Sequence, residues 1–152
     1  MASAAILPAA ACVWILVLVV APIALSRGVA PLGTLAIYRS ASIVCHQKTE
    51  RSFTVAKMQM PVCARCFGLY LAGGAGAFAA FVFGRRRPSP NVHAVRMVLA
   101  AAAVPLLVSV GLEWFGVIQG SNVSRFASAL PLGLSAGWWL QRTVLDSSPE
   151  SR

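Results

Sequence analysis

One uncharged segment decides the fold class of this chain: residues 67–84, FGLYLAGGAGAFAAFVFG. An α-helix needs about 20 mostly apolar residues to cross the hydrocarbon core of a bilayer, and this segment is close to that length. Small residues recur at every fourth position, and such a stripe lets another helix approach one face closely. They are Gly68, Ala72, Gly76, Ala80 and Gly84. The pattern predicts a transmembrane helix at the centre of a bundle.

The composition around this segment is that of an integral membrane protein. Hydrophobic residues make up 58% of the 152 residues and charged residues only 11%. Three further spans are predicted, at about residues 5–25, 95–114 and 126–140. The sequence therefore predicts an all-α bundle of about four transmembrane helices, forming a single membrane domain over residues 1–152.

The first predicted span leaves one alternative open. Small residues at 24–26 would suit a signal peptidase, so the span could be a cleaved secretory signal. No Lys or Arg precedes the apolar run, however, and a basic region is the usual start of such a signal. A retained transmembrane helix is the interpretation that we prefer.

The net charge of +9 does not indicate a nucleic-acid-binding protein. Lys and Arg are scattered among predicted helix ends and loops, without a basic face that carries stacking aromatic side chains. We expect them to anchor the protein at the bilayer surface, so the lipid bilayer is the predicted partner. The small-residue stripe would also support a helix-mediated oligomer.

Basic residues also bear on orientation. They are divided almost evenly between the two predicted sides, but the compact turn at 85–87 places three arginines between two apolar helices. Short basic loops of this kind favour the cytoplasmic side. In a multi-pass protein of the cell membrane, the polar segment 27–66 is then predicted to be extracytoplasmic. Within that segment, apolar residues at helical spacing over 31–44 predict a short interfacial helix, followed by a loop.

The loop and the entrance of the central helix share a cluster of soft metal ligands: Cys45, His46, Cys63 and Cys66. Thiolates and imidazoles are the ligands of tetrahedral zinc sites. Adjacent residues of a helix or strand point in different directions, so Cys45 and His46 can bind one ion together only from a loop. If only one of them binds, a three-ligand site with an open coordination position results. The predicted cofactor is zinc or another soft divalent metal, in a structural, catalytic or transfer role.

Redox chemistry is the alternative for the same cysteines. The dipole of the following helix and the cation of Arg65 would favour thiolate in the Cys63-x-x-Cys66 pair. The layout is similar to that of membrane thiol oxidoreductases that pass electrons to quinone. Those proteins use a second cysteine pair, whereas this chain offers only Cys45 in a comparable loop, because Cys12 lies inside the first apolar run. A third interpretation is structural, with a disulfide or zinc knot that pins the loop to the helix.

Three short motifs connect this cluster to a known family: CHQ at 45–47, RSF at 51–53 and CARCFGLY at 63–70. In combination they resemble the signature of a family of small predicted bacterial membrane proteins of unknown function. With the helix pattern included, the resemblance covers roughly residues 40–141. It implies a membrane protein but names no activity.

Four other residues are candidates for polar or headgroup contacts: Arg51, Arg65, Glu113 and Gln119. Arginines near the bilayer surface commonly contact phosphate headgroups. The resemblance leads us to expect an acidic residue and a glutamine after the third helix, where Glu113 and Gln119 stand, although the surrounding stretch is less motif-like. Nothing in the sequence resembles a nucleotide-binding loop, a serine triad or a metalloprotease helix, so whether the protein is an enzyme stays open.

Overall fold

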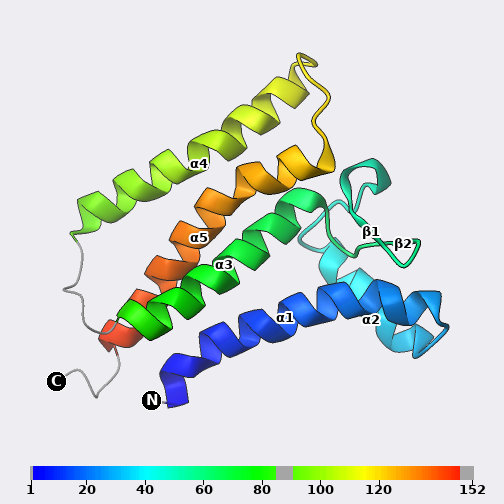
Figure 1. Ribbon diagram of the computed structural model, residues 1–152, viewed down its shortest axis with the longest axis horizontal. Coiled ribbons are helices and arrows are strands. Elements are labelled where there is room, and N and C mark those ends of the chain that lie inside the picture. Colours follow the sequence, from blue (N-terminus) through cyan, green and yellow to red (C-terminus); the bar gives the residue numbers. More distant parts are fainter. Residues whose placement is uncertain (1, 85–90, 148–152) are drawn as a thin grey trace.

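The computed structural model describes residues 2–84 and 91–147. Four long helices dominate it: α1 (Ala2–Ser26), α3 (Ala64–Phe83), α4 (Val92–Trp114) and α5 (Asn122–Ser147). They lie in the spatial order α1, α3, α5, α4 (Figure 1). Long helices that follow one another along the chain run in opposite directions, so the neighbours α3 and α5 run in the same direction. One end of the assembly therefore gathers the segment between α1 and α3 together with the α4–α5 connection. The functional candidates lie at this end.

Three of these helices are long and apolar enough to cross a membrane: Ala4–Ser26, Ala64–Phe83 and Val92–Trp114. They match the predicted spans at 5–25, 67–84 and 95–114. The predicted fourth span, 126–140, lies within α5, which is longer than expected and does not meet this criterion. The apolar run 126–140 is bounded on both sides by polar residues that are buried within the protein, namely Arg125, Gln141 and Arg142. Four transmembrane helices are therefore not confirmed.

The predicted close approach of helices is confirmed at the contact between α3 and α5. A Cβ atom added at Gly68 would lie 2.6 Å from the backbone oxygen of Phe126. A Cβ at Gly137 would overlap the backbone oxygen of Gly73. Only glycine permits such short distances between two backbones. The stripe of small residues thus packs against α5, and α3 contacts both α1 and α5, which agrees with the predicted central position of this helix.

The segment between α1 and α3 begins with the short helix α2 (Pro31–Ser42), which confirms the helix predicted there. The part after Cys45 is more structured than the predicted loop. It contains the 3₁₀-helix η1 (Thr49–Arg51) and an antiparallel hairpin of β1 (Thr54–Val55) and β2 (Met58–Gln59). The prediction of an all-α fold is wrong in this detail.

The hairpin could not be recognised from the sequence for two reasons. Each strand has two residues, too few for an alternating pattern. The turn residues Ala56 and Lys57 both have positive φ, 51° and 66°, without the Asn-Gly or Asp-Gly that usually signals such a turn.

A small buried cluster holds this segment against the helices. It comprises Leu18, Ala41, Cys45, Met60 and Val62, which come from α1, α2 and the chain that leads into α3. Burial of these apolar side chains fixes the position of Cys45 over the entrance of α3. The turn at 85–87, on which the predicted orientation rests, lies outside the described residues.

Candidate metal centre and its basic pocket

Three cysteines meet where the hairpin segment enters α3. Cys63 is the residue before the first turn of α3 and Cys66 lies in that turn, so the Cys-x-x-Cys spacing places both thiols on one side of the helix start. Cys45 arrives from the end of α2. The three Sγ atoms lie within 4.8 Å of one another. The described residues include all four cysteines, and all four are free thiols.

Side-chain amides hold the Cys45 loop against the chain that precedes Cys63. The amide nitrogen of Gln47 donates to the carbonyl oxygens of Tyr38 at 2.7 Å and Pro61 at 2.8 Å. The amide nitrogen of Gln59 donates to the carbonyl of Gln47 at 2.6 Å. Gln47 has φ of 48°, an unfavourable backbone conformation that these bonds help to maintain. The loop that carries Cys45 is therefore fixed by polar contacts as well as by burial.

The surroundings of Cys63 favour the thiolate form of its side chain. A hydrogen bond from the Cys66 side chain is the largest cause that lowers the pKa of Cys63, to about 5, and backbone N–H groups of Cys66 and Arg65 act in the same direction. The backbone N–H of Cys63 in turn donates to Sγ of Cys45 at 3.1 Å. Negative charge on the Cys63 sulfur is thus stabilised by donors already in place. Thiolate is the form that binds metals and attacks electrophiles.

His46 does not join the three sulfurs. Cys45 is 4% exposed, whereas His46 is exposed and lines the cavity beside the thiols. The reason is local, because neighbouring residues of a non-helical chain point in different directions. Cys12 is exposed on α1 and lies outside the cluster.

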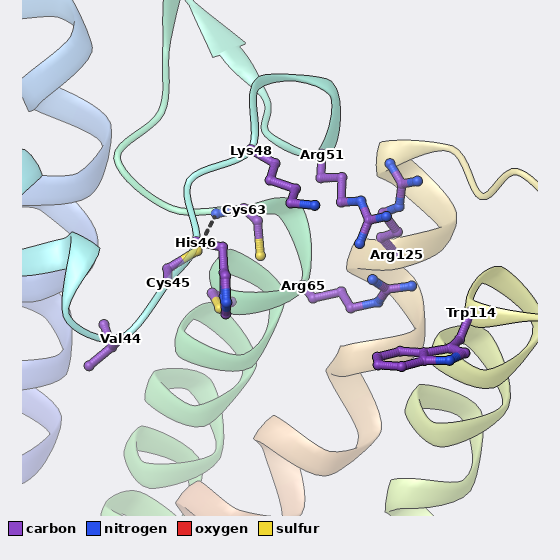
Figure 2. Close-up of a pocket in the computed structure, with 10 residues that line it drawn as sticks. Val44, Cys45, His46, Lys48, Arg51, Cys63, Arg65, Trp114 and Arg125 are labelled. Carbon is purple, nitrogen blue, oxygen red and sulfur yellow. Dashed lines mark hydrogen bonds between the residues drawn. The ribbon is translucent and has the colours of Figure 1, made fainter.

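A cavity of about 350 Å³ opens beside the thiols (Figure 2). Four basic side chains line it, from η1 and its flank, from α3 and from α5. The complete lining is Val44, Cys45, His46, Lys48, Arg51, Cys63, Arg65, Cys66, Trp114 and Arg125. Sulfur donors and positive charges thus share one pocket.

One carboxylate orients two of these arginines. Glu113, at the end of α4, accepts from Arg65 at 2.6 Å and from Arg125 at 3.1 Å, and its side chain is 7% exposed. Arg65 also donates to the hydroxyl of Ser109 at 3.2 Å. Arg125 also donates to the backbone oxygen of Glu50 at 3.2 Å. The network joins α3, α4, α5 and the polar segment.

These contacts change two expectations from the sequence. The side chain of Arg65 is turned to Glu113, and only its backbone N–H is among the groups that lower the Cys63 pKa. Arg125 is one of the basic residues that were expected to anchor the protein at the bilayer surface, but it is a buried part of the pocket wall. The sequence did contain a signal for the pairing of Arg125 with Glu113. Glu113 is the only acidic residue between positions 51 and 145, so several arginines must share it.

Arg51 has a different environment. Its Nε atom is buried without a hydrogen-bond partner, and no contact within the described part of the chain pairs its guanidinium with an acid. Gln119, the remaining candidate, is exposed. It lines a neighbouring hollow together with Glu50, Arg51, Glu113 and Arg125.

Comparison with known proteins places this site in a family. Residues 45–139 match the family described as "Predicted membrane protein (DUF2085)". The chain belongs to the DUF2085 family. The part that matches DUF2085 begins at Cys45 and includes the other two clustered cysteines, Glu113 and Arg125. The three cysteines and the Glu113 network therefore lie within the part of the chain that matches the family.

Two relatives of the chain are archaeal proteins. An uncharacterized protein of Methanothermobacter thermautotrophicus is 32% identical over 91 residues, which cover 60% of this chain and 78% of the relative. An uncharacterized protein of Methanocaldococcus jannaschii is 27% identical over 110 residues, 70% of this chain and 67% of the relative. These relatives do not support the bacterial origin that the resemblance implied. No solved structure matches the chain.

Proposed function

We propose that this membrane protein binds one soft divalent metal ion, zinc before others, through Cys45, Cys63 and Cys66. The observation that carries the proposal is the meeting of three sulfurs within 4.8 Å. Zinc–thiolate bonds of about 2.3 Å hold sulfurs roughly 3.8 Å apart in a tetrahedron, so side-chain adjustments of about 1 Å would complete the site. The backbone N–H of Cys63 donates to Sγ of Cys45, and such hydrogen bonds support metal-bound thiolates.

The fourth coordination position would face the basic pocket. Three protein ligands with one open position are typical of catalytic and transfer sites, whereas structural zinc sites have four protein ligands. His46 lines the same pocket and is the fourth ligand that the sequence predicted, so a change of side-chain rotamer would close the site. The metal site could thus take two forms, an open form with three protein ligands and a closed form in which His46 is the fourth ligand. Only the closed form depends on His46 for metal binding.

The setting that we propose is a bundle forming one membrane domain with an extracytoplasmic metal centre. In this arrangement α5 crosses the bilayer beside α3 as a fourth span. The support is its close packing along α3, which hides its polar residues from lipid.

Elemental analysis of the detergent-purified protein tests the proposal. About one zinc per chain is expected, and Cys63→Ser should lose it, while the matched variant Cys12→Ser should keep it. Equal metal content in both variants would refute the site. His46→Ala distinguishes the two forms, since only the closed form depends on the imidazole.

Thiol–disulfide exchange is the second candidate, and the lowered pKa of Cys63 beside two other thiols favours it. Cys63 would attack a disulfide of the substrate as the thiolate, and Cys66 or Cys45 would resolve the mixed disulfide, so the substrate is reduced as the protein pair is oxidised. In the opposite direction the protein disulfide would oxidise a substrate dithiol and become reduced, and a quinone would be the two-electron acceptor that reoxidises the protein pair. Thiol trapping in cells tests it, because a redox pair shifts between oxidised and reduced forms when respiration is blocked, and constantly reduced thiols would exclude it.

A further inference from the structure

We propose that the basic pocket binds a phosphate-type oxyanion between Arg51, Arg65 and Arg125, next to the open position of the metal. This inference rests on the proposed function, because the anion and the metal's free position share one cavity. The chemistry is that of a phosphate monoester or diester group. A lipid headgroup and a free phosphate both present it.

The first argument is an excess of positive charge. Four basic side chains line the cavity: Lys48, Arg51, Arg65 and Arg125. Glu113 pairs with the last two. Glu113 neutralises only one of these two arginines, and a zinc ion with three thiolates would carry one net negative charge, so two positive charges in the cavity remain unbalanced. Convergent like charges repel one another and attract an anion into the space between them.

The second argument is a set of unused donors. The Nε atoms of Arg51 and Arg65 are buried and have no hydrogen-bond partner. Buried polar atoms without a partner are rare in proteins, because each loses the hydrogen bonds that it makes in water. Figure 2 shows Arg51, Arg65 and Arg125 reaching the same space from three different elements. An anion in that space would accept hydrogen bonds from all three.

The third argument concerns shape. The ion pairs with Glu113 hold Arg65 and Arg125 in place, so two of the three guanidinium groups are already oriented. Several planar forks that converge from different directions suit a tetrahedral anion better than a two-oxygen carboxylate. The cavity of about 350 Å³ is large enough for a phosphate with part of its substituent, since small-molecule sites begin near 300 Å³.

The position of the pocket is consistent with either source of phosphate. Trp114 lines the cavity and is 84% exposed, and the neighbouring Phe115 is 82% exposed. Exposed aromatic side chains at the end of a spanning helix are typical of the headgroup region. A lipid phosphate could enter from the bilayer and a free phosphate from the aqueous side.

Calorimetric titration of metal-loaded protein in a maltoside detergent tests the inference. One arm uses inorganic phosphate, and the other uses mixed micelles with or without phosphatidic acid. Arg51→Gln should weaken binding at least about tenfold, because it removes a charge-assisted donor. The matched control is Lys57→Gln, which removes the same charge from the hairpin turn outside the pocket.

Metal content is measured on the same samples, so that a failure of the proposed metal site can be distinguished from a failure of the proposed phosphate site. Binding of either phosphate source that depends on Arg51, with zinc retained in Arg51→Gln, supports the inference. The arm that binds identifies the source. Zinc without phosphate binding in either arm, or equal binding by Arg51→Gln and wild type, overturns the inference and leaves the metal site standing. Wild-type protein without metal overturns the proposed function and, with it, this inference as stated.

Discussion

Replacement of Glu113 by glutamine is the most informative perturbation of the charge network. The Glu113 side chain is 7% exposed, and its carboxylate accepts from Arg65 at 2.6 Å and from Arg125 at 3.1 Å. Breaking a buried ion pair by removing one partner costs about 3–5 kcal/mol, since the other charge is left uncompensated. Glutamine keeps one carbonyl oxygen as an acceptor, so we expect the lower end, a loss of about 3 kcal/mol in the free energy of unfolding.

The assay is reversible unfolding in mixed maltoside and dodecyl sulfate micelles, followed by circular dichroism. Glu50→Gln is the matched control, because Glu50 is exposed and no ion pair in the described structure involves its carboxylate. Its effect should stay within about 0.5 kcal/mol. A double-mutant cycle with Arg125→Gln should give a coupling energy of at least about 1 kcal/mol. Equal stability of Glu113→Gln and Glu50→Gln, or a coupling energy near zero, would refute the network.

Three other predictions concern the loop, the helix contact and the thiols. Gln47→Ala removes the amide that fixes the Cys45 loop, so zinc affinity measured by chelator competition should fall about tenfold, as for other groups that support metal ligands; unchanged affinity would show that burial alone holds the loop. Gly137→Ala places a methyl group on the α3 backbone and should destabilise the protein by about 1–3 kcal/mol in the same unfolding assay, whereas Gly111→Ala, with open space around it, should not destabilise it. In metal-free protein, the lowered pKa of Cys63, about 5, keeps its thiolate fraction high above that pH and reduces it only as the pH falls through 5. Alkylation of Cys63, followed by mass spectrometry, should therefore hardly slow between about pH 8 and 6, whereas an ordinary thiol with a pKa of about 8.5 slows strongly; Cys66→Ala, which removes the main donor, should restore ordinary behaviour, and ordinary behaviour in the wild type would contradict the assignment.

The predictable part of the fold follows from local composition. A run such as 67–84 has no charge that must be solvated, and a helix satisfies its own backbone hydrogen bonds in lipid, so the run alone predicts a spanning helix. The small residues at every fourth position predict the close contact on one face, and α5 makes that contact. The hairpin at Thr54–Gln59 was not predictable, because its short strands depend on the surrounding contacts for their stability.

The fourth helix shows the limit of composition. Hydropathy treats Arg125, Gln141 and Arg142 as exposed polar residues, whereas in the structure they are buried against other parts of the protein. Gln141, for example, donates to the backbone oxygen of Ala4 in α1 at 2.7 Å. Sequence alone cannot show which polar side chains find such partners.

The candidate site divides in the same way. By itself the sequence determined the membrane class, the central helix and the paired thiols of Cys63 and Cys66, because each depends on residues that are neighbours along the chain. Only the tertiary structure decided that Cys45 joins this pair, that the exposed His46 stays apart from the sulfurs, and that Glu113 holds arginines from two other helices. The physical reason for the Cys45 and Glu113 contacts is that they connect residues that are not neighbours in the sequence, up to 48 positions apart for Arg65 and Glu113, and depend on how whole helices pack.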